Sequence, residues 1–235
     1  MVAAFALSTV SVLVLGLVGR GIPWVGANLG AVVAVVFLYV PVLFAWKRGE
    51  DLHSYGFHAE PAGRGLAIGC IVPLVVFPVF AVGFVIFYDL VCAADAPAYL
   101  AKLALPGMCP RYDGWAGVKF PRFDLAFAEL ALVQLVVIAL PEELFFRGFI
   151  HKLLEDAMPA KRKFLGGQIG WALVLSSALF AAGHLAVGFD PRRLAVFFPG
   201  LLFGWMRSAT GSILAGTIAH AASNLFIHVL ERMFF

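Results

Sequence analysis

Long apolar stretches separated by short polar segments dominate the chain. Each stretch approaches or exceeds the roughly 20 residues that a helix needs to cross the hydrocarbon core of a bilayer. The stretches cover residues 2–19, 24–46, 65–91, 123–151, 166–187, 192–207 and 212–232. Lipid cannot hydrogen-bond to the backbone, and continuous rather than alternating apolarity favours helices over a barrel. The pattern predicts an all-α fold, a polytopic transmembrane helical bundle with about seven spanning helices.

The composition agrees with a membrane protein. Hydrophobic residues make up 62% of the 235 residues and charged residues only 13%, whereas a soluble domain is nearer half apolar and a quarter charged. The net charge of +3 gives no indication of nucleic-acid binding. We therefore expect the lipid bilayer as the environment of the chain. Its richness in Ala, Val, Leu and Gly favours a multi-pass protein of a bacterial inner (cytoplasmic) membrane.

The longest polar segment, residues 92–122, is rich in Pro, Gly and Asp. It carries Tyr112 and Trp115, which suits a loop at a membrane interface. We interpret residues 1–122 as N-terminal transmembrane helices and a loop without a motif. Residues 123–235 form the second part of the same bundle and carry the intramembrane polar residues.

The cysteines Cys70, Cys92 and Cys109 do not have metal-ligand spacing. Cys92 and Cys109 flank one loop and could pair if that loop lies outside the cytoplasm. Alternatively, all three are free thiols that act as small apolar residues. The distribution of Lys and Arg is only slightly biased, in favour of a cytoplasmic N-terminus. The first apolar stretch has no positive region before it, which indicates a retained helix rather than a cleaved signal peptide.

Ionisable side chains at membrane depth cost several kcal/mol, so each needs a partner or a function. The first such cluster lies in the segment Pro141–Gly148. Glu143 and Arg147 are four residues apart and can form an ion pair on one helix face. Glu142 is rotated by about 100° from Glu143 and lacks this partner. An intramembrane acid without a partner suggests a general base or acid.

Two further clusters place histidines in apolar helices. His184 ends one cluster, and His220 and Asn224 are four residues apart on a third helix. At about 1.5 Å per residue, Glu142 lies roughly 25 Å and His184 roughly 30 Å from the loop near 158–165. They therefore reach similar depth and can meet. A His and an Asn side by side can donate two hydrogen bonds to one developing oxyanion.

These motifs together resemble those of a known family. Glu-Glu-x-x-x-Arg at 142–147, Phe-x-x-x-His at 180–184 and His-x-x-x-Asn at 220–224 are similar to the motifs of the CAAX-protease and bacteriocin-processing (Abi) family of intramembrane proteases. The resemblance spans about residues 123–228. It implies a glutamic-type intramembrane protease and makes the second part of the bundle its catalytic helical core.

The resemblance also implies roles for the residues. Glu142, with His184, would activate a water molecule for attack on the scissile carbonyl group. His220 and Asn224 would stabilise the tetrahedral oxyanion. Three residues would support the site: Glu143, Arg147 and Phe180. The implied hydrolysis has no covalent intermediate, no cofactor and no obligatory metal.

Two rival functions stay open. Glu142, His184 and His220 could be zinc ligands of a membrane protease, although the H-E-x-x-H pattern is absent. A non-enzymatic haem-binding or transport protein could use intramembrane His and Glu as axial ligands or as a proton relay. A Soret band would support haem, and activity that survives strong chelators would oppose zinc.

The expected partner is a membrane-anchored polypeptide substrate that is cut near its terminus. The family name suggests a prenylated CAAX tail. The bacterial composition favours instead a leader peptide, or a C-terminal sorting tail of an exported protein.

Overall fold

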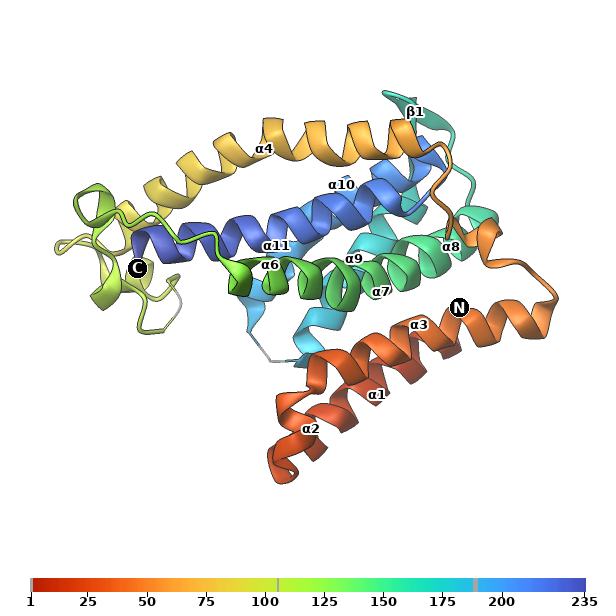
Figure 1. The fold of residues 1–235 in the computed structure, drawn as a ribbon, viewed down its shortest axis with the longest axis horizontal. Coiled ribbons are helices and arrows are strands. Elements are labelled where there is room, and N and C mark those ends of the chain that lie inside the picture. Colours follow the sequence, from red (N-terminus) through yellow and green to blue (C-terminus); the bar gives the residue numbers. More distant parts are fainter. Residues whose placement is uncertain (1, 105, 188–189) are drawn as a thin grey trace. The chain divides into compact units, whose positions relative to one another are not determined.

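We describe the protein from a computed structural model, which defines residues 2–104, 106–187 and 190–235 (Figure 1). The described chain is helical apart from one short β-hairpin. The predicted all-α fold is therefore confirmed.

The chain groups into two compact units. The first contains residues 1–70 and 132–221, and the second contains residues 71–131 and 222–235. The division that we expect at residue 122 concerns the location of the motifs and stays a prediction.

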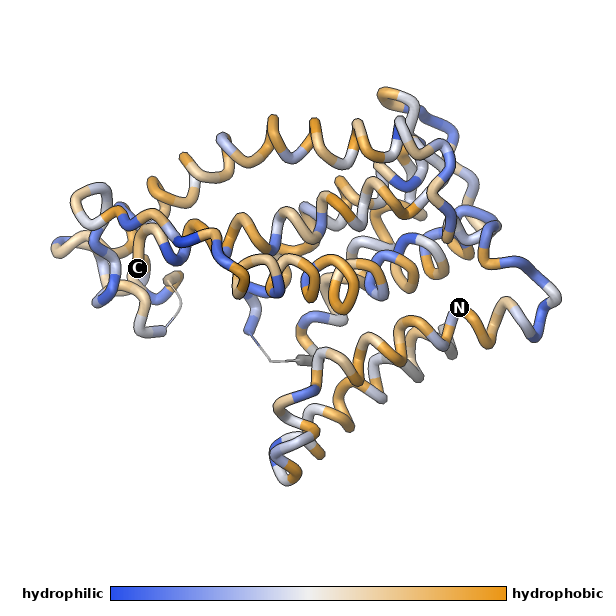
Figure 2. Tube along the Cα trace, in the orientation of Figure 1, coloured by the Kyte–Doolittle hydropathy of each residue, from blue (hydrophilic) through white to orange (hydrophobic). Residues whose placement is uncertain are grey.

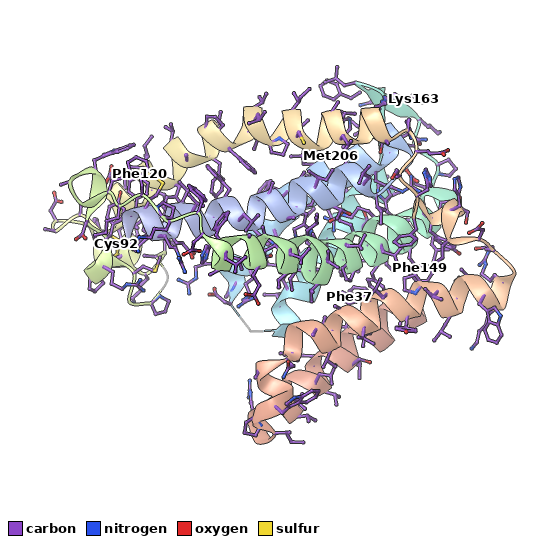
Figure 3. All side chains as sticks on the ribbon, viewed as in Figure 1. Phe37, Cys92, Phe120, Phe149, Lys163 and Met206 are labelled. Carbon is purple, nitrogen blue, oxygen red and sulfur yellow. A yellow bond between two sulfur atoms is a disulfide. The ribbon has the colours of Figure 1, made fainter. Side chains whose placement is uncertain are left out.

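The N-terminal helices of the first unit are α1 (Val2–Gly21), α2 (Pro23–Ala27) and α3 (Leu29–Arg48). The predicted first two spans correspond to α1 and α3. One buried apolar cluster of this unit includes Phe37 from α3 and Phe149 (Figure 3). The burial of large aromatic rings stabilises this packing.

The helix Leu125–Ala157 contains the glutamate motif and changes its winding along its length. Its α-helical parts are α6 (Leu125–Leu132), α7 (Leu140–Glu143) and α8 (Lys152–Ala157). Between them the turns are π-helical, over Val133–Ala139 and Leu144–His151. Pro141 has no N–H to donate, so the regular ladder is interrupted there. Such π-helical turns are frequent at functional sites.

The segment after this helix differs from the prediction. An antiparallel hairpin precedes the next helix: β1 (Arg162–Phe164), β2 (Gly167–Ile169), then α9 (Trp171–Val187). The prediction that a span begins at residue 166 is wrong, because Leu165 and Gly166 turn the chain with φ angles of 47° and 85°. The Trp205 indole donates a hydrogen bond to the Phe164 carbonyl, with Nε1 and O 2.8 Å apart, and holds the hairpin.

The last two helices are α10 (Phe197–Thr210) and α11 (Leu214–Phe234). The predicted start of a span at residue 192 is wrong, because Pro191–Val196 forms a 3₁₀ helix before α10. Gly211, with a φ of 79°, ends α10. Beside this turn, the carbonyl of Gly56, which follows the 3₁₀ helix Leu52–Tyr55, accepts a hydrogen bond from the Ile213 amide at 3.0 Å.

Among the described residues, three helices are long and apolar enough to cross a membrane: Leu29–Arg48, Ala62–Val91 and Leu125–Ala157. Figure 2 shows apolar residues along most of the helices and polar residues gathered in the loops. Shorter apolar helices cover Thr9–Gly21 and Trp171–Leu185. Helix α11 has sufficient length, but polar side chains interrupt it. The chain is thus an integral membrane protein, and the count of about seven spans stays a prediction.

The second unit is built around the later part of α4 (Ala62–Val91) and the end of α11. Phe77 and Phe226 stack with ring centroids 4.3 Å apart and join these two helices. Val85, Leu230 and Phe234 are buried in the same cluster.

The loop after α4 is closed by a disulfide between Cys92 and Cys109. Of the two alternatives that the sequence leaves open for these cysteines, the structure has the pairing. Cys70 is a free, exposed thiol. The loop also contains the short helix α5 (Ala98–Ala101), and Cys92 and Phe120 are labelled there in Figure 3.

Candidate functional site

All but one of the predicted site residues lie in the first unit. Helix α7 and the π-helical turn after it, together with α9 and α11, supply them. They are Glu142, Glu143, Arg147, Phe180, His184 and His220. Asn224 lies on α11 one turn beyond His220, in the part of that helix that belongs to the second unit. Its role stays a prediction.

The ion pair expected between Glu143 and Arg147 is confirmed. The Oε1 atom of Glu143 and a guanidinium nitrogen of Arg147 are 3.2 Å apart, and both side chains are almost completely buried, at 0% and 1% exposed. Burial of one charge alone would be costly, so each partner makes the other tolerable.

Two aromatic rings flank the Arg147 guanidinium. Its central carbon lies 4.0 Å from the centroid of Phe180 and 5.4 Å from that of Phe203. This geometry permits cation–π attraction, which is strongest away from water. Gly200 lets α10 approach, because a Cβ atom there would lie 3.3 Å from both Arg147 and Phe180.

His220 lies between the two glutamates. Its Nδ1 atom is 3.0 Å from Oε1 of Glu143, and its Nε2 atom is 3.7 Å from Oε2 of Glu142. The ring stacks on Phe203 at 5.1 Å and is 5% exposed. Since an ionised carboxylate only accepts hydrogen bonds, Nδ1 carries the proton. Nε2 of His220 therefore faces Glu142 as an acceptor in the neutral ring.

His184 is oriented by its own helix. Its Nδ1 atom is 3.0 Å from the Phe180 carbonyl oxygen, and the two rings meet edge to face at 4.6 Å. A carbonyl oxygen can only accept, so Nδ1 donates and Nε2 of the neutral ring is an acceptor. Partly buried His184 thus presents the nitrogen that can take a proton from water.

Phe180 is the common neighbour of these groups. Its ring contacts His184, Arg147 and also His220, whose centroid is 5.9 Å away. The expected packing position of Phe180 is therefore present. Within the described parts of the chain, the ionisable side chain that faces the Glu142 carboxylate is His220, at 3.7 Å. The pairing of Glu142 with His184 around a water stays a prediction.

Two carboxylate oxygens of the site accept no hydrogen bond from the described residues. Oε2 of Glu142 and Oε2 of Glu143 are buried and accept no hydrogen bond in the described structure. Buried carboxylate oxygens usually accept a hydrogen bond. Glu142 is the more accessible of the two, with 17% of its side chain exposed.

Sequence reasoning assigned no role to Gly200, Phe203 or Gly216. A Cβ atom at Gly216 would lie only 2.8 Å from Oε2 of Glu143, so this glycine makes room for the carboxylate. Gly200 and Gly204 have the small-xxx-small spacing that allows close helix packing, and this pattern was the available signal. Phe203 gave no signal, because it is one of many apolar residues in its helix.

A second buried polar group also escaped sequence analysis. His151 is 1% exposed, and its Nε2 atom lies 3.4 Å from Oε1 of Glu155 one turn later. Arg207 is likewise a buried charged residue to which sequence analysis gave no role, with 8% of its surface exposed. The spacing of His151 and Glu155 on one helix was the signal that could have identified their contact.

The zinc alternative needs three ligands around one point. Among the residues that the structure describes, no group of three His, Cys, Asp or Glu side chains could hold a metal ion. Glu142 and His220 approach each other, and His184 would have to join them.

Buried Glu, His and Arg side chains thus meet on facing apolar helices. Residues 124–226 match the family model described as Type II CAAX prenyl endopeptidase Rce1-like, and this segment includes every predicted site residue. The chain therefore carries an Rce1-like domain of the CAAX protease family. This family match supports an intramembrane peptidase of the glutamic type. No curated protein and no solved structure matches the chain.

Proposed function

We propose that the protein cleaves a membrane-associated polypeptide near its terminus, by direct attack of a water molecule. The buried arrangement of Glu142, His220, Glu143 and Arg147 carries this proposal. It holds one carboxylate, with an oxygen that accepts no hydrogen bond, beside an imidazole on apolar helices.

In the proposed reaction, Glu142 and Nε2 of His184 hold the water. Glu142 accepts a proton as the water oxygen bonds to the scissile carbonyl carbon. The carbonyl π electrons move to oxygen and form a tetrahedral oxyanion. The C–N bond then breaks, and the proton passes from Glu142 to the departing amine nitrogen. Water is thus divided between a new carboxyl group and a new amine.

His220 and Asn224 are the proposed donors to the oxyanion. The Nδ1–H of His220 is already donated to Glu143, so donation from Nε2 requires the doubly protonated ring. Glu143 and Arg147 are positioning residues in this proposal. They fix His220 without contacting the substrate.

The disulfide supports an assignment of the membrane topology and of the cellular location of the chain. Disulfides persist outside the cytoplasm, so the loop that contains Cys92 and Cys109 belongs on the outer side of a bacterial inner membrane. That assignment places the N-terminus inside if α1 and α3 each cross once. We propose that α9, α10 and α11 also cross, which makes about seven spans.

We propose as substrate a leader peptide or a C-terminal sorting tail of an exported protein. This choice follows from the outer placement of the 92–122 loop and the inner placement of the 158–165 loop. Glu142 lies roughly 25 Å along its helix from the 158–165 loop on the inner side. The site is therefore in the outer half of the membrane. A prenylated tail is the other outcome, and the family supports it by name.

Comparison of protein termini tests the function. N-terminal and C-terminal proteomics would be run on cells with the wild-type protein, Glu142→Ala or Glu129→Ala. Glu129 is an exposed carboxylate on the same helix and is the matched control. We expect a set of new termini that disappears only with Glu142→Ala. Identical termini in all three strains would overturn the proposal, and lipid on the released peptide would identify a prenylated tail.

A further inference from the structure

A cavity of about 380 Å³ lies in the second unit, where the last turns of α11 face the loop that follows the disulfide. Three cations line it: Arg111, Lys119 and Arg232. His228 and Glu231 complete its polar lining. With His228 neutral, three cations and one carboxylate leave a charge of +2. The cavity therefore favours an anion.

The charge is not cancelled by neighbouring groups. Lys119 lies 4.0 Å from Asp113, at the limit of an ion pair, and both side chains are largely exposed. Such a contact contributes little. Within the described residues, no ion pair joins Glu231 to Arg111 or Arg232. The two arginines are thus available to a ligand.

The loop side of the cavity is held in place by the end of the helix. The Lys119 amide donates to the Met233 carbonyl at 3.0 Å, and the Asp113 amide donates to the Phe234 carbonyl at 3.3 Å. These bonds satisfy carbonyls that a helix end leaves free. The cations therefore project from a fixed backbone, which reduces the entropy lost on binding.

The cavity also has an apolar part. Met108 and Phe235 line it beside the cations. The Phe235 ring is held by Tyr88 and Tyr112, with centroids at 4.9 and 5.3 Å. An anion that also carries apolar groups fits this lining better than a free inorganic ion.

The position of the loop indicates where such a ligand is found. It connects the candidate spans Ala62–Val91 and Leu125–Ala157 and so lies at a membrane surface. Trp115, Phe120 and Phe123 are exposed by 69%, 82% and 70% in or beside it. Exposed aromatic rings are typical of the headgroup region.

We propose that this cavity binds the phosphate group of an anionic phospholipid. The arginine guanidinium matches phosphate geometry with paired hydrogen bonds, and basic pockets at membrane depth bind anionic headgroups. The volume falls within the roughly 300–1,000 Å³ of small-molecule sites. The glycerol and first acyl carbons contact Met108 and Phe235. This site is separate from the proposed protease function and its test does not use activity.

Native mass spectrometry of the purified full-length protein tests the proposal, with phosphatidylglycerol, phosphatidylcholine or glycerol phosphate as probe. We expect preferential retention of phosphatidylglycerol. In Arg111→Gln/Arg232→Gln the apparent affinity should fall about tenfold or more, because two charge-assisted hydrogen bonds are lost. The matched control is Lys102→Gln/Arg122→Gln, which removes two exposed cations of the same loop that do not line the cavity.

Several results would overturn the site. They are equal retention of phosphatidylglycerol by both double variants, equal retention of phosphatidylcholine, or full competition by glycerol phosphate, which would show a free-phosphate site. If the arginine variant fails to fold, Lys119→Gln provides the same comparison with one charge. A loss confined to the cavity variants supports the proposal.

Discussion

The Nδ1 atom of His220 lies 3.0 Å from the Oε1 atom of Glu143, although the two residues are 77 positions apart in the chain. The same oxygen faces Arg147 at 3.2 Å. One buried carboxylate oxygen thus joins the helix that carries Glu142 to helix α11. The orientation of His220, and with it the Nε2 atom near Glu142, depends on this shared contact.

Replacement of Glu142 tests the chemistry with the least structural change. Glu142→Gln keeps the size of the side chain and removes the group that accepts the water proton. We expect cleavage of the identified substrate to fall by about 10²- to 10⁴-fold, with an unchanged thermal transition in detergent. Activity close to that of the wild type would contradict the proposed base.

Removal of both partners of the buried ion pair should cost less than the two single removals added together. Glu143→Gln leaves Arg147 charged and uncompensated, which should cost about 3–5 kcal/mol of unfolding free energy. Glu143→Gln/Arg147→Met should cost less than the sum of the single changes. Denaturant titration of the wild type, Glu143→Gln, Arg147→Met and the double variant measures the coupling. Additive losses of unfolding free energy would disprove it.

The close approach of α10 predicts a specific effect of one methyl group. Gly200→Ala places a Cβ atom 3.3 Å from Arg147, Phe180 and Ser177. We expect a loss of about 1–3 kcal/mol from overpacking. The control is Gly83→Ala on α4, where nothing lies within 4 Å of the added atom. The control should be neutral or slightly stabilising, and a similar loss at both positions would show a general intolerance instead.

The disulfide predicts both stability and location. Opening the loop with Cys92→Ser/Cys109→Ser should destabilise the second unit by about 3 kcal/mol, by the closure of a loop of this length. The change in electrophoretic mobility on addition of reductant should disappear in this variant and persist in Cys70→Ser. After reduction, an impermeant thiol reagent should label Cys92 and Cys109 in intact bacterial cells. Protection of both from the reagent would place the loop inside.

The loop before α4 predicts a dependence on pH. Tyr55 donates a hydrogen bond to Glu50. Burial and this bond raise the pKa of Tyr55 to about 12. The bond from Tyr55, and then that from Arg48, lowers the pKa of Glu50 below 4.5.

The two groups destabilise the fold at opposite ends of the pH scale. The contribution of Tyr55 is complete below pH 10 and is lost as pH rises through about 12. That of Glu50 is complete well above 4.5 and is lost as pH falls through its lowered pKa. Tyr55→Phe should flatten both limbs of the stability curve measured by thermal unfolding. Unchanged limbs would show that the contact does not affect stability.

The spacing of residues along the chain was enough to predict the helices and several contacts within them. The apolar stretches predicted helices because lipid leaves backbone groups no other partner. The contact of Glu143 with Arg147 followed from a separation of four residues on one helix, which is a property of the helix itself. The same holds for the placement of Phe180 and His184 one turn apart on α9.

Only the tertiary structure decided how the helices meet. Nothing in the spacing of His220 indicates that its ring lies between Glu142 and Glu143, or that it stacks on Phe203. These contacts depend on which faces pack together and on the glycines that let them approach. The start of α9 was likewise set by a turn rather than by hydropathy, because positive φ angles at Leu165 and Gly166 are not encoded in apolarity. Hydrophobicity specifies which segments enter the membrane, and packing specifies which side chains then face one another.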